Sequence, residues 1–253
     1  MAIFGVIGGS GLDDPDILDD ARDIRVDTPY GEPSSPIKAG RINGREVRIL
    51  ARHGREHTIP PTFVNNRANI HALKEAGCQC ILATTAVGSL RRRIERGHMV
   101  IPDQFIDFTR LRKLSFHESF EPHSPIHTPM ADPFDAELRK RLITACQDML
   151  IPHHERGVVV TIEGPRFSTR AESNMFRMLG ADVINMSTAP ECALAAEAGI
   201  PYAAVAMSTD YDCWKQDEAP VTWEEILRIF NENAKNVTAV LVEAVTRAPQ
   251  QDE

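Results

Sequence analysis

The sequence lacks most features that mark secreted, membrane-spanning or metal-dependent proteins. Its five cysteines are an odd number without the C-x-x-C spacing of zinc sites, so we expect reduced packing thiols and no metal centre. No apolar run reaches the length that spans a membrane. The N-terminus, MAIFGVIGGSG, has no basic segment before its apolar residues, so we expect no signal peptide and a cytoplasmic location.

Basic residues are also in the minority. Lysine and arginine number 28 against 36 aspartates and glutamates, a net charge of −8, which argues against a nucleic-acid or anionic-membrane partner. No Gly/Ser-rich linker, repeat or low-complexity tract divides the 253 residues, so we expect a single domain over residues 1–253. Gly8, Gly9 and Gly11 lack the G-x-G-x-x-G spacing of dinucleotide sites, which argues against a nicotinamide cofactor.

Apolar segments of strand length alternate with segments of helical periodicity along the chain. Strands are predicted at residues 2–7, 45–51, 78–83, 157–162, 183–186 and 203–207, with a further apolar segment at 99–108. Helices are predicted from about 62 to 76, after Asp132-Pro133, from Thr169 to Gly180, from Pro190 to Gly199 and after Thr222. This alternation predicts an α/β fold.

The residues that follow the predicted strands are suited to binding a ligand. In open α/β sheets, ligands bind beyond the carboxyl ends of the strands. A glycine turn, a guanidinium and a hydroxyl suit an oxyanion, an aromatic ring offers a stacking face, and carboxylates can recognise a base with an amino group and a ring nitrogen. The strand ends carry, in chain order, Ser10, Arg52, His53, Thr85, Ala86, Phe167, Ser168, Met186, Ser187, Asp210 and Asp212. Together they indicate a site for phosphate and a purine nucleoside.

Each of these features also has an ordinary structural explanation. Arg52 could lie in a solvated loop and His53 in a turn. Asp210 and Asp212 could cap a helix or a turn. The polar segment 110–133 is longer than an ordinary connection, and we interpret it as a lid or an oligomer contact. The convergence of several anion-friendly strand ends favours the functional interpretation over these alternatives.

Longer motifs identify a family. They are, in order, VIGGSGLDDP, LARHGREHTIPP, TTAVGSLR, IPDQFID, TIEGPRFSTRAES, GADVINMS and MSTDYDCWK. Through these motifs the sequence resembles the trimeric class of the purine nucleoside phosphorylase superfamily over nearly its whole length. The resemblance implies one domain with a central mixed, twisted β-sheet flanked by α-helices. It also implies a homotrimer or a dimer of trimers.

The resemblance assigns a role to each candidate residue. The phosphate ligands would be Ser10, Arg52, His53, Thr85, Ala86 and Ser187. The ribose would meet Met186, and the base would meet Phe167, Ser168, Asp210 and Asp212. The 5′ substituent would meet Trp223, Ile226 and, from a neighbouring subunit, His127. Family members more often carry threonine at the positions of Ser10 and Ser187 and a smaller aliphatic residue at that of Trp223. Because serine keeps the hydroxyl, we expect phosphate binding to survive.

The activity implied is that of a pentosyltransferase in purine and methionine salvage. Phosphate would cleave the N-glycosidic bond of 5′-methylthioadenosine to give adenine and 5-methylthioribose 1-phosphate, with phosphate as co-substrate and no cofactor. Asp210 would share a proton with purine N7 and Asp212 would recognise the 6-amino group, although the two could exchange these roles. The alternatives are a phosphorylase for 6-oxopurine nucleosides or methylthioinosine, against which the Asp-x-Asp segment argues, and a silent nucleotide-binding module on the same fold.

Overall fold

The computed structural model describes residues 2–9, 16–217 and 222–247. Within them one sheet contains β1 (Phe4–Gly8), β2 (Asp19–Ile24), β3 (Ile37–Ile42), β4 (Arg45–Ala51), β5 (Cys80–Ser89), β6 (Met99–Val100), β7 (Gln104–Phe108), β8 (His153–His154), β9 (Val158–Ile162), β10 (Val183–Asn185) and β11 (Tyr202–Asp210). The main order is β2-β3-β4-β1-β5-β10-β9-β7, with β11 pairing with β5 and β6, and β8 with β6. Parallel and antiparallel pairs both occur, so the predicted mixed sheet is confirmed.

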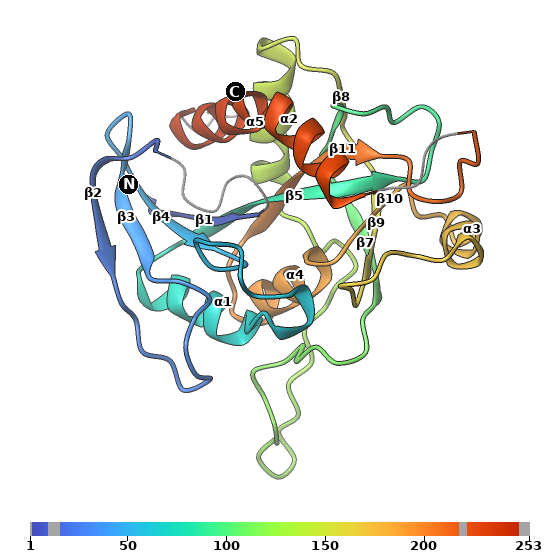
Figure 1. Cartoon of the computed structure of the whole chain (residues 1–253). Helices are drawn as coiled ribbons and strands as arrows, with labels where there is room; N and C mark the ends of the chain where they lie inside the picture. Colours follow the sequence, from blue (N-terminus) through green and yellow to red (C-terminus); the bar gives the residue numbers. More distant parts are fainter. Residues whose placement is uncertain (1, 10–15, 218–221, 248–253) are drawn as a thin grey trace, which may run out of the picture.

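Helices cover both faces of the sheet. They are α1 (Asn66–Glu75), α2 (Ala136–Asp148), α3 (Arg170–Met178), α4 (Thr188–Glu197) and α5 (Trp223–Thr246), with a short 3₁₀ turn η1 (Pro61–Phe63). Figure 1 shows α2 and α5 together on one side of the sheet and α1 and α4 on the other, and each pair is in contact. The predicted α/β class and the flanking helices are therefore confirmed.

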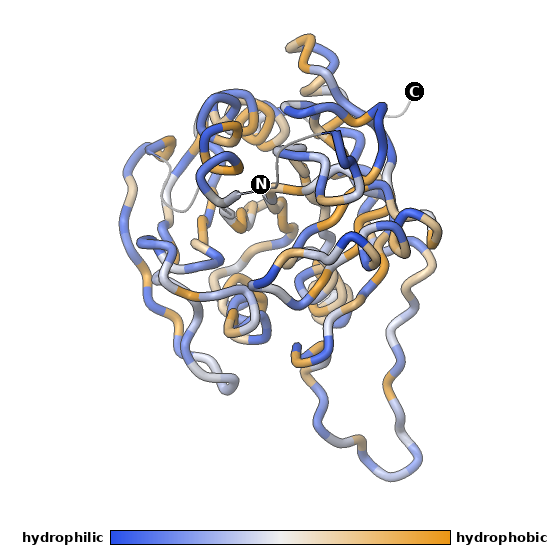
Figure 2. Tube along the Cα trace, turned by 45° about the vertical axis from the view of Figure 1, so that its right-hand side comes forward, coloured by the Kyte–Doolittle hydropathy of each residue, from blue (hydrophilic) through white to orange (hydrophobic). Residues whose placement is uncertain are grey.

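The innermost strands are mostly apolar, up to their carboxyl ends, because both of their faces are buried. In β11, Val205 and Met207 pack into the apolar cluster beneath α2 and α5. Ala204 and Ala206 point the other way, into the cluster beneath α1 and α4. Strands buried on both faces lose the apolar–polar alternation of half-exposed strands, which explains the continuous run in the sequence. Figure 2 shows orange, hydrophobic segments of the chain gathered in the interior of the molecule.

Strand direction brings the candidate residues together. β1 is parallel to β4 and β5, and β5 is parallel to β11. Their carboxyl ends therefore meet at one edge of the sheet, where Arg52 follows β4 and Asp210 ends β11. Asp210 lies opposite Gly88 of β5, beyond a register shift at Ser208.

Several predicted boundaries were wrong. The helix predicted from residue 62 is broken into η1 and α1, because the Asn65 side chain caps α1 by accepting from the amide of Ala68 at 3.2 Å. The helix predicted after Asp132-Pro133 begins at Ala136 instead, capped by Asp135.

The hairpin of β3 and β4 was not predicted, nor was β2. Asn43 and Gly44 both have positive φ, 47° and 79°, which is the signature of a type I′ hairpin turn. An Asn-Gly pair is a strong hairpin signal, so this turn was recognisable from the sequence. β2, reading DDARDI, is mostly exposed and carries no apolar alternation by which a strand could be recognised.

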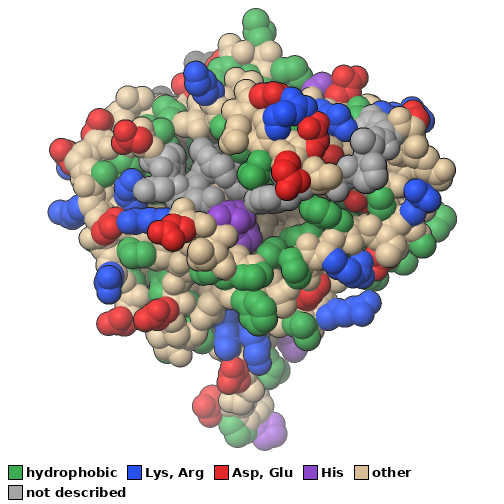
Figure 3. Space-filling model, viewed as in Figure 1, with side chains coloured by type: hydrophobic (Ala, Val, Ile, Leu, Met, Phe, Trp, Pro, Cys, Tyr) green, Lys and Arg blue, Asp and Glu red, His purple; other side chains and the backbone are tan. Residues whose placement is uncertain are grey.

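Residues 109–133 form a long arm, which begins against the body, where Glu163 and Glu197 accept from the amides of Leu111 and Phe116, and then projects from it (Figures 1 and 2). Apart from a bridge between Glu121 and Ser124, it contains no regular element. Leu111, Phe120 and Ile126 are exposed on it. Acidic and basic side chains are interspersed over the face of the molecule shown in Figure 3. Among the described residues, no helix combines the length and the hydropathy needed to cross a bilayer.

Candidate active site

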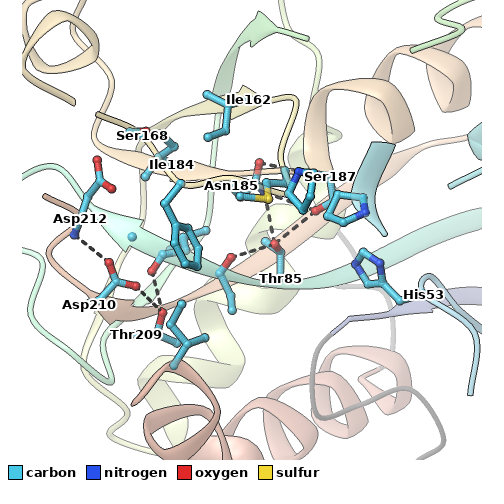
Figure 4. Close-up of a pocket in the computed structure, with 18 of the residues that line it drawn as sticks. His53, Thr85, Ile162, Ser168, Ile184, Asn185, Ser187, Thr209, Asp210 and Asp212 are labelled. Atoms are coloured by element: carbon cyan, nitrogen blue, oxygen red, sulfur yellow. Dashed lines mark hydrogen bonds between the residues drawn. The ribbon is translucent and has the colours of Figure 1, made fainter. Parts of the chain in front are cut away.

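A cavity of about 400 Å³ opens at the carboxyl ends of β4, β5, β10 and β11. The sequence-predicted residues that line it are Arg52, His53, Thr85, Ala86, Phe167, Ser168, Met186, Ser187, Asp210, Asp212 and Ile226. The fold thus brings together residues that lie far apart in the chain. Figure 4 shows Thr85, Ser187 and His53 at one end of the cavity and Asp210 and Asp212 at the other.

Three predicted residues are not placed at this cavity. Ser10 and the side chain of Trp223 lie outside the described residues. His127 is exposed on the arm, where its ring lies 6.0 Å from that of Phe120. Its contribution to a neighbouring subunit stays a prediction.

The first end of the cavity is called the anion end: Arg52, His53, Thr85, Asn185 and Ser187. Its hydroxyls surround the amide nitrogen of Asn185, which donates to Thr188 Oγ1 at 2.5 Å and shares its second hydrogen between Thr85 Oγ1 at 3.2 Å and Ser187 Oγ at 3.5 Å. The two hydroxyls lie 3.3 Å apart. A fully buried hydrogen bond from Thr161 at 2.9 Å holds the carbonyl oxygen of the same amide. Sequence reasoning missed Asn185, although a lone polar residue in the apolar strand VIN was a usable signal.

Arg52 is buried rather than solvated. Its Nη1 donates to the carbonyl oxygen of Thr84 at 2.9 Å, and its Nη2 donates to Glu191 Oε2 at 3.1 Å. Nε donates to the other oxygen of the same carboxylate. Glu191 was not predicted from the sequence, because no local pattern in α4 indicates that it pairs with Arg52, which follows β4.

Gly9 leaves the space that Arg52 occupies. A Cβ on Gly9 would lie 2.5 Å from Arg52 Nη1 and 2.8 Å from the Thr84 carbonyl oxygen, both too close for any side chain. The Gly9 amide donates to Thr84 Oγ1 at 3.1 Å. Gly9 is therefore explained by close packing against the guanidinium, while the rest of the predicted glycine turn, Ser10 and Gly11, lies outside the described residues.

His53 is a neutral imidazole at physiological pH. Its Nδ1 lies 2.8 Å from the carbonyl oxygen of Ile59, and since a carbonyl only accepts, Nδ1 carries the hydrogen. Burial, and then the neighbouring charge of Arg52, lower the pKa of His53 to about 3. The ring of His57 stacks at 4.5 Å from it, and His57 also lines the cavity.

The other end is called the carboxylate end: Phe167, Ser168, Asp210 and Asp212. Asp210 is 5% exposed; its Oδ1 accepts from the Asp212 amide at 2.7 Å and its Oδ2 from Thr209 Oγ1 at 2.8 Å. Burial raises the pKa of Asp210 to about 6, and the charge of Asp212 adds to the rise. This carboxyl can hold a proton close to neutral pH.

Asp212 is held in an unusual conformation with an unmatched acceptor. Its φ is 50°, in the left-handed region, and burial raises its pKa. Among the described residues, Ser168 Oγ, Ser173 Oγ and Asp212 Oδ2 are buried side-chain atoms without a partner in hydrogen-bonding geometry, although the Ser173 hydroxyl is close enough to Asp212 to lower its pKa against the effect of burial. Buried polar atoms of native proteins are nearly always paired, so Ser168 Oγ and Asp212 Oδ2, whose residues line the cavity, fit a site that a polar ligand completes.

Glycine also leaves room at this end. A Cβ on Gly88 would lie 3.0 Å from Asp210 Oδ1 and 3.4 Å from Asp212 Cβ. Phe167 is 42% exposed and stands on the cavity wall. A planar ring entering here would meet an aromatic face, a floor without side chain and two carboxyl groups, which is the chemistry that recognises an aminopurine.

Known proteins resemble the chain over nearly its whole length. The S-methyl-5′-thioadenosine phosphorylase of Danio rerio is 52% identical over 252 residues, which cover 98% of this chain and 90% of that protein. The enzyme of the same name from Nitrosopumilus maritimus is 44% identical over 247 residues, covering 98% and 92%.

A solved structure of an enzyme of this kind also resembles the chain. The methylthioadenosine phosphorylase of Schistosoma mansoni, solved in complex with adenine, matches with a TM-score of 0.90 and 40% identity, covering 97% of this chain and 91% of that one. A family model described as the phosphorylase superfamily matches residues 3–246. The chain belongs to the phosphorylase superfamily.

Proposed function

We propose that the chain cleaves 5′-methylthioadenosine with inorganic phosphate, releasing adenine and 5-methylthioribose 1-phosphate. One observation carries the proposal. A single cavity has hydrogen-bond donors for an oxyanion at one end and a carboxyl group of raised pKa at the other. The names of the relatives described above support the same activity.

Phosphate would bind at the anion end. The hydroxyls of Thr85 and Ser187 face one another there, beside the guanidinium of Arg52 and the neutral ring of His53. Phosphate is an acceptor at every oxygen, so hydroxyl, N–H and guanidinium donors suit it. Held on the far face of the sugar, it would act as the nucleophile and as a nearby negative charge that stabilises the cationic sugar carbon.

The purine would leave from the carboxylate end. As the N-glycosidic bond breaks, electron density moves onto the base, and a proton placed at N7 makes the leaving group neutral. Asp210 is the better donor, because its pKa is raised to about 6 by burial. Asp212, with its unmatched Oδ2, would accept from the 6-amino group. Phe167 would stack on the ring and Met186 would contact the ribose.

The 5′ side would be apolar. Ile226, in the first turn of α5, lines the cavity together with Pro61 of η1. A methylthio group suits such walls, whereas a 5′-hydroxyl gains no partner from them. We propose that Trp223 completes this wall, and that His127 of a neighbouring subunit reaches the same 5′ end.

A substrate panel tests the function. Purified protein is incubated with 5′-methylthioadenosine, adenosine, methylthioinosine or inosine, each with and without phosphate, and release of free base is followed by absorbance. We expect phosphate-dependent release of adenine, fastest from 5′-methylthioadenosine. Preferential cleavage of inosine or methylthioinosine would replace the proposal by a 6-oxopurine phosphorylase. Binding of nucleoside without phosphate-dependent turnover would indicate a silent binding module.

We also propose that the protein acts in the cytoplasm as a homotrimer or a dimer of trimers, without a cofactor. The exposed apolar side chains of Leu111, Phe120 and Ile126 on the projecting arm support a subunit contact there. Sedimentation equilibrium gives the number of subunits. A monomer that turns over at full rate would contradict both the assembly and the role of His127.

A further inference from the structure

A buried ion pair joins the anion end to a carboxylate behind the cavity wall. Glu191 is 1% exposed and does not line the cavity, whereas its partner Arg52 does. Nε and Nη2 of the guanidinium donate to the two oxygens of the Glu191 carboxylate. Nη1 donates to the carbonyl oxygen of Thr84 at 2.9 Å. The plane of the guanidinium is therefore set by two separate groups on its hidden side.

A buried ion pair is weak evidence of a gain in stability. Moving two charges out of water is costly, and apolar residues of similar volume often replace a buried ion pair without loss of stability. What a bidentate carboxylate does provide is orientation, because its two oxygens match two parallel N–H groups of arginine. The geometry thus points to a need for Arg52 in one fixed pose.

Glu191 is itself held on two further sides. The hydroxyl of Tyr202 donates to Glu191 Oε2 at 2.8 Å. Burial and the nearby carboxylate hold the pKa of Tyr202 well above its ordinary value, so the hydroxyl remains a donor. Glu191 also lies in the first turn of α4, where the helix dipole favours a negative charge. The series Tyr202, Glu191, Arg52 thus runs from the core to the wall of the cavity.

We propose that Glu191, held by Tyr202, is a positioning residue for the phosphate co-substrate: it fixes the guanidinium of Arg52 so that its donors face the anion end. This inference rests on the proposed function. The carboxylate also balances the charge of Arg52, so phosphate binding depends on how the donors are aimed more than on net positive charge. Neither Glu191 nor Tyr202 touches the substrate in this arrangement.

Steady-state kinetics of three variants tests the proposal. In Glu191→Gln the phosphate KM should rise by about 10- to 100-fold, the range expected when a binding group is misplaced by about 1 Å, with the nucleoside KM within about twofold of the parental value. Glu191→Asp keeps the charge but shortens the side chain, so it should fall between parent and Gln. Tyr202→Phe removes only the supporting hydroxyl and should raise the phosphate KM by a smaller factor.

The matched control is Asp182→Asn. Asp182 is another buried carboxylate bound to arginines, Arg91 and Arg93, but it does not line the cavity. Its loss should lower the unfolding temperature while leaving the phosphate KM unchanged. If Glu191→Gln and Tyr202→Phe behave like Asp182→Asn, with lower unfolding temperature and unchanged phosphate KM, the pair is structural and the proposal is wrong. If Glu191→Gln does not fold, Tyr202→Phe and Glu191→Asp decide by the same criterion.

A binding measurement separates this inference from the proposed function. Inorganic phosphate alone should raise the unfolding temperature of the parental protein, because a ligand that binds only the folded state stabilises it. Glu191→Gln should need about 10- to 100-fold more phosphate for the same rise. That result would support the positioning role even if 5′-methylthioadenosine proved not to be the substrate. Equal phosphate responses in parent and variant would overturn it, whatever the substrate panel gives.

Discussion

The two ends of the cavity differ in how completely their polar groups are hydrogen-bonded. At the anion end, Asn185 connects the hydroxyls of Thr85 and Ser187, and Glu191 holds Arg52. At the carboxylate end, Asp212 Oδ2 and Ser168 Oγ are buried without a partner among the described residues, and the pKa of Asp210 is raised. One end is organised before any ligand arrives, and the other is completed by its ligand.

This difference follows from what each end has to bind. Phosphate accepts hydrogen bonds in many directions, so affinity depends on donors that are already aimed and lose little freedom on binding. The base has one pattern of donors and acceptors, and unmatched protein atoms reject a base that does not satisfy them. The fixed donors of the anion end therefore favour phosphate binding, and the unmatched atoms of the carboxylate end favour one base over others.

The largest effect is expected from removing the proton at the carboxylate end. Asp210→Asn keeps the shape but cannot act as an acid, so kcat for phosphorolysis should fall by about 10²- to 10⁴-fold. The phosphate KM should change little, because the anion end is untouched. Initial rates over a range of phosphate concentrations check this. A near-parental rate in the folded variant would contradict the assignment and would turn attention to Asp212.

The same substitution should make the protein more stable at neutral pH. The pKa of Asp210 rises from 3.8 unfolded to about 6 folded, so the folded state binds the proton more tightly and stability decreases as pH rises through this interval. Asp210→Asn removes this dependence and should gain about 3 kcal/mol above pH 7, with the gain shrinking towards pH 4. Denaturant unfolding from pH 4.5 to 8 measures it. A gain independent of pH would show that burial of the charge is not its cause.

Crowding the anion end should affect phosphate selectively. In Gly9→Ala the new methyl group would collide with Arg52 Nη1 and with the Thr84 carbonyl oxygen that holds it, so the guanidinium must shift and the phosphate KM should rise by about 10- to 100-fold. The nucleoside KM should stay close to the parental value. Gly5→Ala, in the strand β1 that leads to Gly9, is the control, because the three atoms nearest to its Cβ belong to the side chains of Ile81 and Cys78 and none belongs to Arg52. An equal rise in both variants would mean that crowding of β1, and not the pose of Arg52, is responsible.

The smallest effect is expected at the wall of the carboxylate end. Phe167→Leu keeps an apolar side chain but loses the aromatic face, so the KM for the nucleoside should rise by about two- to tenfold. The phosphate KM, measured at saturating nucleoside, serves as the internal control. A change in the phosphate KM with an unchanged nucleoside KM would contradict the assignment of Phe167 to the base.

The strand ends were predictable because local patterns report them. An apolar run that stops at a polar residue marks the end of a buried strand, and parallel neighbours bring such ends together. The capping box of Thr169 and Glu172 was likewise confirmed where the sequence predicted it. The structure confirmed the predicted fold class, and the comparisons with known proteins confirmed the predicted family. The roles of the individual site residues stay predictions.

The partners of these residues were not predictable. Glu191 is 139 positions from Arg52 in the chain, and Asn185 is 100 positions from Thr85. Neither belongs to a local pattern that names its partner, because side-chain pairing across the sheet depends on the order in which strands and helices are placed. Burial has the same origin: the sequence shows that Asp210 and Asp212 are carboxylic acids, but only folding, which pairs Asp210 with Gly88 of β5, removes water and raises the pKa of Asp210.

By itself, the sequence determined which chemical groups stand at the strand ends, the α/β class and the family. The tertiary structure decided which of those groups are fixed by hidden partners and which are left unmatched. The reason is physical: residue type and periodicity are local properties of a chain, whereas desolvation and hydrogen bonding belong to groups that meet only after folding.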